Sequence, residues 1–519
     1  MSDERNELPE GWVWASLGRV ATLNMGQSPK GTFTNDVGEG VPLLGGASDL
    51  QAGGPKPTRY TSRPTKVCRP GDIIVCVRAT IGKIVKADRE YCLGRGVAGI
   101  GPGSINGDFL RLYLTGQIEQ LEGLGTGTTF KQISRDDLDV FPVPLAPLPE
   151  QRRIVAKIEA LFEQSRTTRQ ALDRVPPLLK KFRQSVLAAG FRGDLTRDWR
   201  EENPNVEAAS ILLGRVCTER LRHYQEQVKR AKAERQRPPR RPAQLHHPEL
   251  GMVNVDELPA SWAWTTVEFL ASPEPRSVQS GPFGSNLHHS EFQDTGILAV
   301  GIDNVLDGRF TIGSQHRISF EKYEQLKKYT ARPLDVLMTV MATVGRCCLA
   351  PEDLEPAIIT KHVYRISVDH QLCEPSYLMN ALRGSPAVQE QLYGEIQGVT
   401  RPGINGQILK RLNIPLAPLA EQRVITSRIE TLLKQAEAIE AAVEATRQRA
   451  EKIEQSILAR AFRGELVLQD PNDEPASVLL GRIGTKRGMP GASKRPRPDD
   501  LGKRKHHAAR RKASGGFGN

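Results

Sequence analysis

A long internal repeat is the feature that most constrains how this chain of 519 residues can fold. The phrase PLAPLPEQR at 144–152 returns as PLAPLAEQR at 415–423, which is an offset of 271. Around it, residues 143–164 match residues 414–435 at 13 of 22 positions. Four more phrases recur in the same order, namely LPEGWVW (8–14) as LPASWAW (258–264), PGDIIVCVRATIGKIVKA (70–87) as PLDVLMTVMATVGRCCLA (333–350), SVLAAGFRGDL (185–195) as SILARAFRGEL (456–466), and ASILLGR (209–215) as ASVLLGR (476–482). The chain is therefore a duplication of about 200 residues, and its two halves are expected to fold alike.

The spacing between the copies separates a variable part from a part of fixed length. The offset rises from 250 at the tryptophan phrase to 271 at the EQR phrase, so the second globular part is longer by 21. Between the EQR and FRG phrases the offset stays at 271. One extra residue rotates the rest of a helix by ~100° and advances it by ~1.5 Å. Constant length is therefore expected of a helix that fixes the distance and angle between two bodies.

The part of fixed length is predicted to be a coiled-coil helix. Its apolar residues recur in alternating steps of four and three, which is a heptad pattern. The predicted seam contains Ile425, Ile429, Leu432, Ile439, Val443, Ile453 and Ile457 in the second copy, and Ile154, Ile158, Leu161 and Leu172 in the first. VPP at 175–177 predicts a break in the first copy alone. An ordinary amphipathic surface helix is the alternative interpretation.

Two such helices could set a spacing. About 36 residues of helix form a rod of roughly 54 Å. If the two helices pair antiparallel, the globular parts lie near opposite ends and the halves are related by a pseudo-twofold axis. This symmetry suits a protein that reads two half-sites on duplex DNA about one helical turn, ~34–36 Å, apart.

The globular parts are predicted to be α+β domains, because short β-runs such as DIIVCV and DVLMTV alternate with Gly/Pro-rich turns and helical stretches. The predicted fold is two mixed α/β domains separated by two long antiparallel coiled-coil helices with pseudo-twofold symmetry. The predicted segments are a first globular domain (1–143), a first spacer-helix region (144–195), an LLGR segment with a basic linker (196–257), a second globular domain (258–413), a second spacer-helix region (414–467), a repeated LLGR segment (468–483) and a disordered basic tail (484–519).

The net charge of +12 is concentrated in two of these segments. Residues 215–241 carry ten Lys and Arg against three acids, and residues 484–519 carry eleven against two. These surpluses of 7 and 9 exceed the net charge by four, so the rest of the chain carries −4. Such runs are either solvated tails or a source of non-specific attraction to a polyanion such as DNA.

Several classes of protein are excluded by what the sequence lacks. No apolar run is long enough to cross a bilayer, and the seven cysteines show no CxxC pair, which predicts a cytoplasmic protein without disulfides, structural zinc or membrane contact. There is also no GxxxxGK[ST] loop for ATP, no Gly-rich S-adenosylmethionine fingerprint and no Asn-Pro-Pro-aromatic adenine pocket. We therefore expect no catalytic residues and no metal site in this chain.

Candidate DNA-contacting residues lie mainly in a Gly-Thr stretch before each long helix. Base reading needs polar or basic side chains on exposed turns that reach a groove. The candidates are Thr128, Thr129, Lys131 and Gln132 in the first copy and Thr400, Arg401, Asn405 and Gln407 in the second. A basic run adds Arg59, Arg63, Lys66 and Arg69, and a weaker set is Lys361 with His362 and Arg365. Gly-rich surface turns and solvated loops are the alternatives.

The tryptophans of the repeated phrase are predicted to pack in the core. Trp12, Trp14, Trp262 and Trp264 have i, i+2 spacing and stand where each domain begins. Stacking on bases is the alternative role for such aromatic side chains.

The layout as a whole resembles the specificity subunit of type I restriction-modification systems over residues 1–483. Two dissimilar domains, each beginning with LPxxWxW, alternate with two helices that carry PLAPLxEQRxI and FRGxL, and GQSPKG (26–31) and GPFGSNLHHSEF (281–292) look like openings of the family's target recognition domains. The resemblance implies a non-catalytic reader of a split, asymmetric DNA target. The long basic linker and the basic tail depart from the family's layout.

The same resemblance implies partners and cofactors. The expected partners are double-stranded DNA, two S-adenosylmethionine-dependent adenine-N6 methyltransferase subunits, and ATP-driven translocase/endonuclease subunits, with S-adenosylmethionine, ATP and Mg held by those partners. We read the residues that begin the long helices as helix caps or anchors first and as methyltransferase-docking candidates second: Glu150, Gln151, Arg152, Glu421, Gln422 and Arg423.

Two rival functions remain open at this point. One is a coiled-coil adaptor whose globular domains bind proteins instead of DNA. The other is a nuclease that acts alone with a divalent metal. Selective enrichment of one gapped DNA motif would support the reader, whereas cleavage by the purified chain would point to the nuclease.

Overall fold

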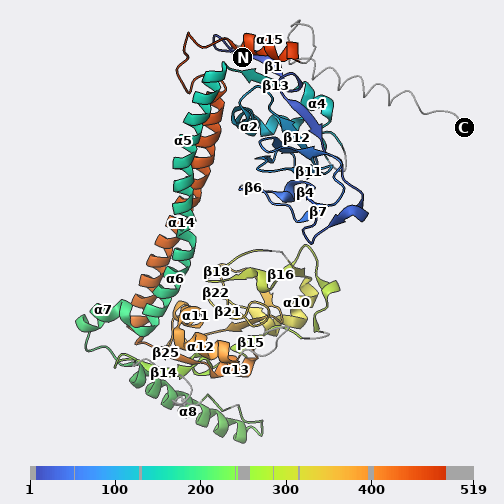
Figure 1. Ribbon diagram of the computed structural model, residues 1–519. Coiled ribbons are helices and arrows are strands. Elements are labelled where there is room, and N and C mark those ends of the chain that lie inside the picture. Colours follow the sequence, from blue (N-terminus) through green and yellow to red (C-terminus); the bar gives the residue numbers. More distant parts are fainter. Residues whose placement is uncertain are drawn as a thin grey trace, which may run out of the picture. The chain divides into compact units, whose positions relative to one another are not determined.

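The computed structural model describes residues 8–51, 53–127, 131–239, 241–243, 258–283, 286–313, 316–395 and 403–486. The chain divides into two compact units (Figure 1). Unit 1 consists of Met1–Asp173 and Ala445–Asn519, and unit 2 of Arg174–Glu444. Each unit contains segments from both copies of the repeat.

Unit 1 contains a globular domain, which we call domain 1, that is built on two sheets. One has the strand order β10-β9-β12-β2 and the other β3-β7-β4-β11-β8, while β1 and β13 form a separate antiparallel pair. The strands are β1 (Val13–Ser16), β2 (Thr22–Met25), β3 (Thr34–Asn35), β4 (Val41–Leu44), β5 (Leu50–Gln51), β6 (Gly54–Pro55), β7 (Arg59–Thr61), β8 (Val67–Cys68), β9 (Ile73–Cys76), β10 (Ile84–Lys86), β11 (Tyr91–Leu93), β12 (Val97–Gly101) and β13 (Pro142–Leu145). The helices are α1 (Leu17–Val20), α2 (Gly107–Gly116), α3 (Ile118–Leu124), α4 (Arg135–Asp139), α5 (Leu148–Asp173) and α15 (Ala476–Lys486).

Unit 2 contains the second globular domain, domain 2. Its sheets have the strand orders β15-β24-β21-β22 and β19-β16-β23-β20, and β14 pairs with β25. The strands are β14 (Ala263–Thr266), β15 (Val278–Ser280), β16 (Ile297–Val300), β17 (Val305–Leu306), β18 (Arg309–Phe310), β19 (Arg317–Ile318), β20 (Thr330–Ala331), β21 (Val336–Thr339), β22 (Cys347–Leu349), β23 (Ala357–Ile359), β24 (Val363–Ile366) and β25 (Asn413–Leu416). The helices are α6 (Val175–Arg192), α7 (Arg197–Glu202), α8 (Ala209–Ala233), α9 (Val267–Leu270), α10 (Phe320–Leu326), α11 (Pro375–Gly384), α12 (Pro386–Glu395) and α13 (Gly406–Arg411); α14 (Leu419–Ala461) begins in unit 2 and ends in unit 1.

The two domains repeat one topology although their sequences differ. The order β10-β9-β12-β2 corresponds to β22-β21-β24-β15, and β7-β4-β11-β8 corresponds to β19-β16-β23-β20. In both domains the second sheet contains one parallel pair, β4 with β11 and β16 with β23. The mixed helix-and-strand class and the two-domain arrangement predicted from the sequence are therefore confirmed.

The central strands form where the sequence predicts them. DIIVCV and DVLMTV give β9 and β21, and all four residues of each strand are buried. Continuous apolar runs of this kind suit strands that are covered on both faces. Residues 108–123 and 375–392 each form two helices. In the second stretch the helix is interrupted at Ser385, because Pro386 disfavours a helical conformation in the residue before it.

Each unit buries the end of a long helix from the other copy of the repeat. In unit 1, Phe462 follows α14 and its ring lies 5.1 Å from those of Phe109 and Tyr113 in domain 1. In unit 2, Phe191 of α6 lies 5.1 Å from Tyr377 of domain 2. The repeated LLGR helices follow the same exchange, since α15 joins the core of domain 1 and α8 joins that of domain 2.

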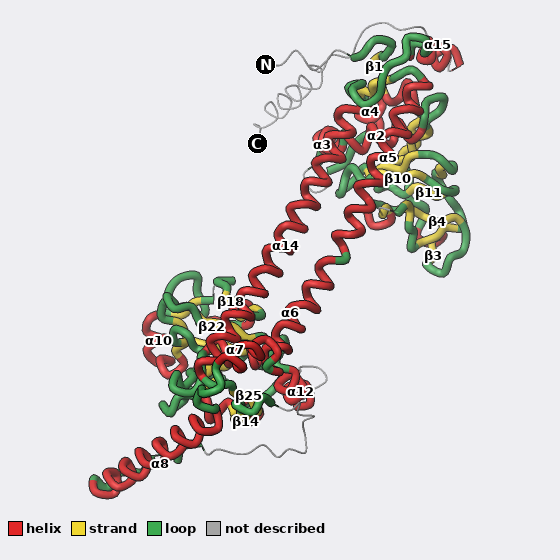
Figure 2. The backbone as a smooth tube through the Cα atoms, turned by 90° about the vertical axis from the view of Figure 1, so that its left-hand side faces the viewer, coloured by secondary structure: helices red, strands yellow, loops and turns green. Residues whose placement is uncertain are grey.

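Within each unit two long helix segments run side by side in opposite directions (Figures 1 and 2). In unit 1, Arg169 of α5 pairs with Glu454 of α14 at 2.9 Å, and Asp173 pairs with Arg447 at 2.6 Å, so positions rise along one helix as they fall along the other. In unit 2, Arg183 of α6 pairs with Glu440 of α14 at 2.6 Å. α5 ends at Asp173 and α6 begins at Val175, which confirms the predicted break.

Nine of the predicted seam residues are buried or half-buried, and two are exposed. Ile154, Ile158, Ile425, Ile429 and Val443 are buried, and Leu161, Leu172, Leu432 and Ile457 are half-buried. Ile439 and Ile453, however, are 49% and 57% exposed. A straight helix drifts by ~20° per heptad from a strict seven-residue repeat, so a seam read at period 3.5 leaves the contact face. The drift is visible at the end of α14, where Leu458 is buried more deeply than Ile457.

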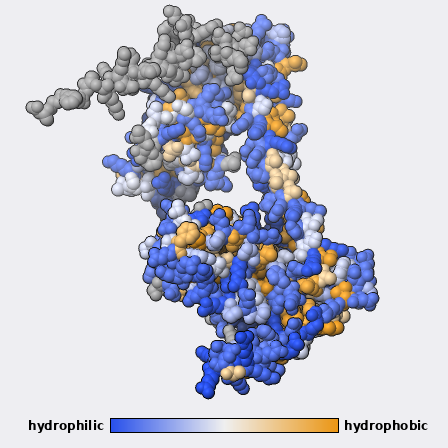
Figure 3. Space-filling model, turned by 180° about the vertical axis from the view of Figure 1, so that it is seen from behind, coloured by the Kyte–Doolittle hydropathy of each residue, from blue (hydrophilic) through white to orange (hydrophobic). Residues whose placement is uncertain are grey.

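Hydrophilic residues cover most of the face shown in Figure 3, and hydrophobic residues lie in scattered groups. None of the helices that the structure describes is both long enough and apolar enough to cross a bilayer.

A glycine at the end of α11 gives a direct test of the packing of α6 on domain 2. A Cβ atom at Gly384 would lie 2.3 Å from Cβ of Leu187, whereas a Cβ at Gly214 in α8 would meet nothing within 4 Å. We expect Gly384→Ala to lower the free energy of unfolding of the full chain by about 1–3 kcal/mol, because the close helix contact must open. The control Gly214→Ala should raise it by about 1 kcal/mol, because Ala is the better helix former. Urea denaturation measures both, and equal effects of the two variants would contradict this packing.

Candidate nucleic-acid interface and the anchors of the long helices

A buried hydrogen bond ties the beginning of each long helix to its own domain. Nε1 of Trp12 donates to Oε2 of Glu150 at 3.0 Å, and Nε1 of Trp262 donates to Oε2 of Glu421 at 2.9 Å. The two tryptophans come from LPxxWxW and the two glutamates from the EQR phrase. Two of the repeated phrases are therefore partners in the same contact, made once in each unit.

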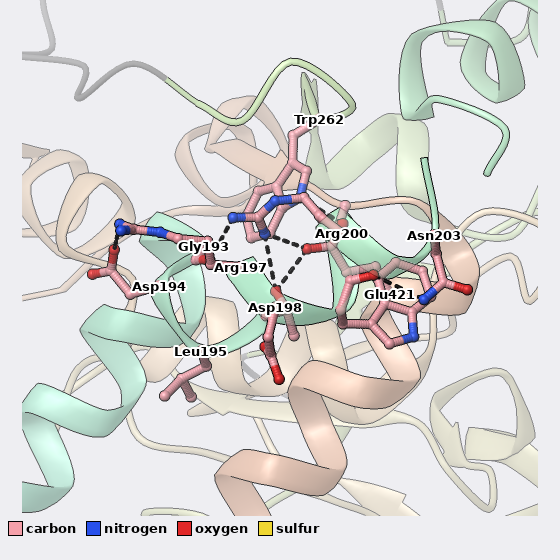
Figure 4. Close-up of polar contacts among 12 residues, drawn as sticks. Gly193, Asp194, Leu195, Arg197, Asp198, Arg200, Asn203, Trp262 and Glu421 are labelled. Atoms are coloured by element: carbon pink, nitrogen blue, oxygen red, sulfur yellow. Dashed lines mark hydrogen bonds and ion pairs between the residues drawn. The ribbon is translucent and has the colours of Figure 1, made fainter. Parts of the chain in front are cut away.

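In unit 2 the glutamate is fully satisfied (Figure 4). Oε1 of Glu421 accepts hydrogen bonds from Oγ1 of Thr196 at 2.6 Å and from Nη1 of Arg200 at 2.5 Å. Nη2 of Arg200 also donates to the carbonyl oxygen of Gly193 at 2.7 Å. The buried carboxylate thus has a counter-charge and three donors, which offset the cost of removing it from water.

In unit 1 the corresponding carboxyl group lacks these donors. Among the residues that the structure describes, none donates a hydrogen bond to the buried Oε1 of Glu150. The repeat explains the difference. FRGDLT in the first copy corresponds to FRGELV in the second, so Val467 stands at the position of Thr196. The segment that follows is four residues shorter in the second copy and forms no helix like α7. Burial raises the pKa of Glu150, and the hydrogen bond from Trp12 lowers it by less.

The glutamine of the EQR phrase anchors each helix in a second way. The side chain of Gln151 donates to the carbonyl of Ala146 and accepts from the backbone N–H of Asn106, at 2.8 and 2.9 Å. Gln422 donates to the carbonyl of Ala417 at 2.9 Å and accepts from the N–H of Glu374 at 2.9 Å. Each glutamine thereby joins the beginning of its long helix to the first residues of a domain helix.

These contacts correct one prediction and leave another open. Glu150, Gln151, Glu421 and Gln422 are at most 1% exposed, so their predicted second role in docking a methyltransferase is wrong, because a docking partner cannot reach their side chains. They are anchors of the long helices. Arg152 and Arg423 are exposed, and Arg423 pairs with Glu374 at 2.6 Å; their role in docking stays a prediction.

The Gly-Thr stretch of domain 1 lies beside the end of strand β9. The N–H of Ala79 donates to the carbonyl of Lys131, and the N–H of Ile133 donates to that of Val77, both at 2.9 Å. Gln132 forms a backbone bridge with Arg78, and the Lys131 and Gln132 side chains are exposed. Two predicted contact residues, Lys131 and Gln132, therefore gather with a basic residue, Arg78, at one end of the central sheet.

The corresponding stretch of domain 2 is described only in part. Thr400 and Arg401, like Thr128 and Thr129 in domain 1, lie outside the described residues. Gln407 is exposed at the beginning of α13. Oδ1 of Asn405 caps that helix, accepting from the N–H groups of Gln407 and Ile408 at 2.9 and 3.0 Å. This corrects the prediction for Asn405, because bidentate reading of adenine needs the same oxygen.

The other predicted basic residues do not form one patch. Arg59 is the first residue of β7, and Arg63 follows that strand. Lys66 and Arg69 flank β8, which is separated from β7 by β4 and β11 in the same sheet. All four are exposed, and Arg63 stacks over the ring of Phe33 at 4.4 Å.

The weaker set around Lys361 is divided by burial. Arg365 is 4% exposed and pairs with the buried Asp335, so a DNA contact by Arg365 is wrong. Lys361 is exposed on the turn between β23 and β24. The turn between β11 and β12 in domain 1 carries Arg95 at the corresponding place, and this residue was not among the predicted contacts.

The tryptophan prediction holds for one residue of each pair. Trp12 and Trp262 are 8% and 5% exposed and belong to the two main cores. Trp14 is 40% exposed and Trp264 is half-buried. Core packing is therefore wrong for Trp14.

Comparison with known proteins places these features in a family. A family model described as the type I restriction modification DNA specificity domain matches residues 9–176 and 309–446. The chain is 26% identical over 507 residues to the type I restriction enzyme EcoBI specificity subunit of Escherichia coli, covering 94% of this chain and 95% of that protein.

Two further similarities extend the comparison. The chain is 34% identical over 193 residues to a putative type I restriction enzyme MjaX specificity subunit of Methanocaldococcus jannaschii, covering 36% of this chain and 45% of that protein. A solved structure described as "Structural basis underlying complex assembly and conformational transition of the type I R-M system" has a similar fold, with a TM-score of 0.59 and 22% identity over 88% of this chain and 99% of that one.

The two anchors predict opposite responses to one substitution. Glu421→Gln removes the counter-charge of Arg200, whose side chain is 20% exposed, and should cost about 1–3 kcal/mol. Glu150→Gln keeps an acceptor for Trp12 and removes a poorly satisfied buried charge, so it should stabilise unit 1 at neutral pH. Hydrogen exchange followed by mass spectrometry should show faster exchange near residue 421 in the first variant and slower exchange near residue 150 in the second.

The stability of unit 1 is expected to depend on pH through Glu150. Because the pKa of Glu150 is raised in the folded chain, the stability gained from its protonation is complete below the ordinary glutamate pKa. That stability is lost as the pH rises through the raised value. Exchange near residue 150 should therefore quicken over this range in the wild type and not in Glu150→Gln, after correction for intrinsic exchange rates. Equal profiles for the two would contradict the assignment.

Proposed function

The chain belongs to the family of type I restriction modification DNA specificity domains, and from this premise we propose how its two units divide the reading of one DNA target. Its function is that of the DNA sequence-recognition subunit of a type I restriction-modification complex, and it is not itself an enzyme. We propose that domain 1 and domain 2 are its two target recognition domains and that each reads one half of a split, asymmetric site.

The observation that carries the proposal is that both domains have one strand topology but different loops. Equivalent strands support both domains, while the loops differ in length and residues, since the second globular part is the longer of the two. Unlike loops on a shared framework suit two half-sites of unlike sequence. A symmetric target would need no such difference between the halves.

We propose that the long helices form an antiparallel coiled coil with pseudo-twofold symmetry, which sets the unread gap between the half-sites. The opposed ion pairs Arg169–Glu454 and Arg183–Glu440 support this arrangement. So does the exchange of helix ends, because each long helix begins on its own domain and its end is buried in the core of the other unit.

The partners proposed are two adenine-N6 methyltransferase subunits and the translocase/endonuclease subunits of the complex. A reader with two similar halves can present one methyltransferase to each DNA strand. The methyltransferases would hold S-adenosylmethionine, and the translocase/endonuclease would hold ATP and Mg. We propose that the complex acts in the cytoplasm. Nothing in the comparisons favours a protein-interaction adaptor instead.

The proposal is tested by selection from a pool of random duplexes. The purified chain with its methyltransferase subunits should enrich one motif made of two defined halves separated by a gap of fixed length. Absence of enrichment, with the partner present and folded, would contradict sequence reading. The chain alone with a divalent metal should leave the DNA uncut.

The helices as spacers predict the effect of a change in length. Four residues inserted into the 425–457 helix advance the rest of that helix by about 6 Å and rotate it by roughly 40°. The insertion should change the gap in the selected motif or abolish binding, while both half-site sequences stay the same. Altered half-site sequences would contradict the role of the helices as spacers.

A further inference from the structure

One turn is built in the same way in both domains. In domain 1 the N–H of Gly94 donates to the carbonyl of Leu44 at 2.8 Å, and in domain 2 that of Thr360 donates to Val300 at 2.9 Å. The carbonyls of Gly96 and His362 then accept from the N–H groups of Val77 and Val340, at 2.9 and 3.1 Å. The turns between β11 and β12 and between β23 and β24 are therefore structural equivalents.

Each turn carries one exposed basic residue at its middle. The sequences are Gly-Arg-Gly at 94–96 and Thr-Lys-His at 360–362, so the positive charge is kept while its neighbours change. Arg95 and Lys361 are both exposed. Among the described residues, neither side chain has an ion-pair or hydrogen-bond partner. A charge kept on an exposed turn, with no role inside the domain, indicates a contact outside it.

The backbone around the turn is held rigidly. A Cβ atom at Gly26 would lie 2.1 Å from the carbonyl oxygen of Gly94, and one at Gly281 would lie 2.1 Å from that of Ile359. Only glycine permits this approach of the segment after β2 or β15 to the turn. The basic residue is thus presented on a preformed support, which lowers the entropy lost on binding.

A strained loop lies next to the turn in both domains. The ATIG and ATVG loops place Ala79 at φ 62° and Ala342 at φ 63°, a left-handed conformation that disfavours alanine. Strain kept in both copies is expected where the path of the loop matters for function. These loops adjoin the Gly-Thr stretches, through Ala79 to Lys131 and through a backbone bridge from Met341 to Gly403.

Three basic residues of domain 1 lie around one end of the central strand. Asp72 precedes β9, whereas Arg78, Arg95 and Lys131 surround its far end. A group of like charges at one end of a sheet attracts a polyanion. In domain 2 the position of Arg78 is taken by Met341, so this neighbour of the turn differs between the copies while the turn itself keeps its cation.

We propose, resting on the proposed function, that Arg95 and Lys361 each contact a DNA phosphate and set the register of their domain on the duplex. Phosphates are the same in every sequence, whereas base edges differ between half-sites. Two domains that read unlike half-sites should therefore share the residue that holds the backbone and differ in those that read bases. The shared cation and its unlike neighbours fit that division.

Fluorescence anisotropy tests the assignment with the full chain and its methyltransferase subunits. The probes are a duplex with the motif that the wild type selects and a duplex of equal length with both half-sites scrambled. Arg95→Ala and Lys361→Ala should weaken binding to both probes by the same factor, on the order of tenfold each. The slope of log K against log salt should fall in size by about 0.9 per variant.

Matched variants separate this role from loss of charge in general. Arg89→Ala removes a cation between β10 and β11, at the opposite end of β9, and Arg332→Ala does so before β21; both should leave affinity and salt slope unchanged. Arg95→Lys should restore most of the binding, since a lysine also contacts a phosphate. Thermal unfolding should change little in all variants, because the side chains lie at the surface.

The possible results are distinct. If the wild type selects no motif, the proposed function fails. If it selects a motif and Arg95→Ala and Lys361→Ala bind with unchanged affinity and slope, only the present inference fails. If either variant selects different bases in its half-site, the residue reads sequence and the phosphate assignment is overturned.

Discussion

The hydrogen bond from a buried tryptophan to a buried glutamate is the contact on which each unit is organised. It fixes the direction in which a long helix leaves its domain, and the neighbouring glutamine fixes the same helix to a domain helix. The end of α14 is buried in unit 1, where Phe462 packs against Phe109 and Tyr113, and the end of α6 is buried in unit 2, where Phe191 packs against Tyr377. Burying one such side chain contributes about 1.5–3 kcal/mol.

The duplication preserved this framework and allowed the details to diverge. Glu421 has Trp262, Thr196 and Arg200 as donors, while among the residues that the structure describes Glu150 has only Trp12. The first copy needs a break at Arg174 between α5 and α6, while α14 continues through 43 residues. Such differences are tolerated because the anchoring geometry depends on the tryptophan, the glutamate and the glutamine, which both copies retain.

The sequence predicts the elements of this fold better than their contacts. Apolar runs predict β9 and β21, and proline predicts the break before Val175, because these signals are local. The exchange of helix ends is not local, since periodicity identifies the buried face of a helix and not its partner. Ile439 and Ile453 show a further limit, because a heptad extrapolated along most of α14 ignores the drift of a real helix. The repeated tryptophan and EQR phrases did contain a usable signal: groups that stay together in both copies are candidates for contact.

The candidate interface follows from comparing the copies in space. Arg95 is separated from Arg78 and Lys131 in the chain, and only the ladder of hydrogen bonds at the end of β9 brings their turns together. Its equivalence to Lys361 cannot be read by alignment, since the flanking residues differ and the offset between copies is changing there. Equivalent backbone bonds identify the position, and what stands there is a positive charge both times. A duplicated reader must hold the same polyanion at both sites while distinguishing different bases. Positions that are alike in both copies therefore suit the backbone contact, and positions that differ suit the reading of bases.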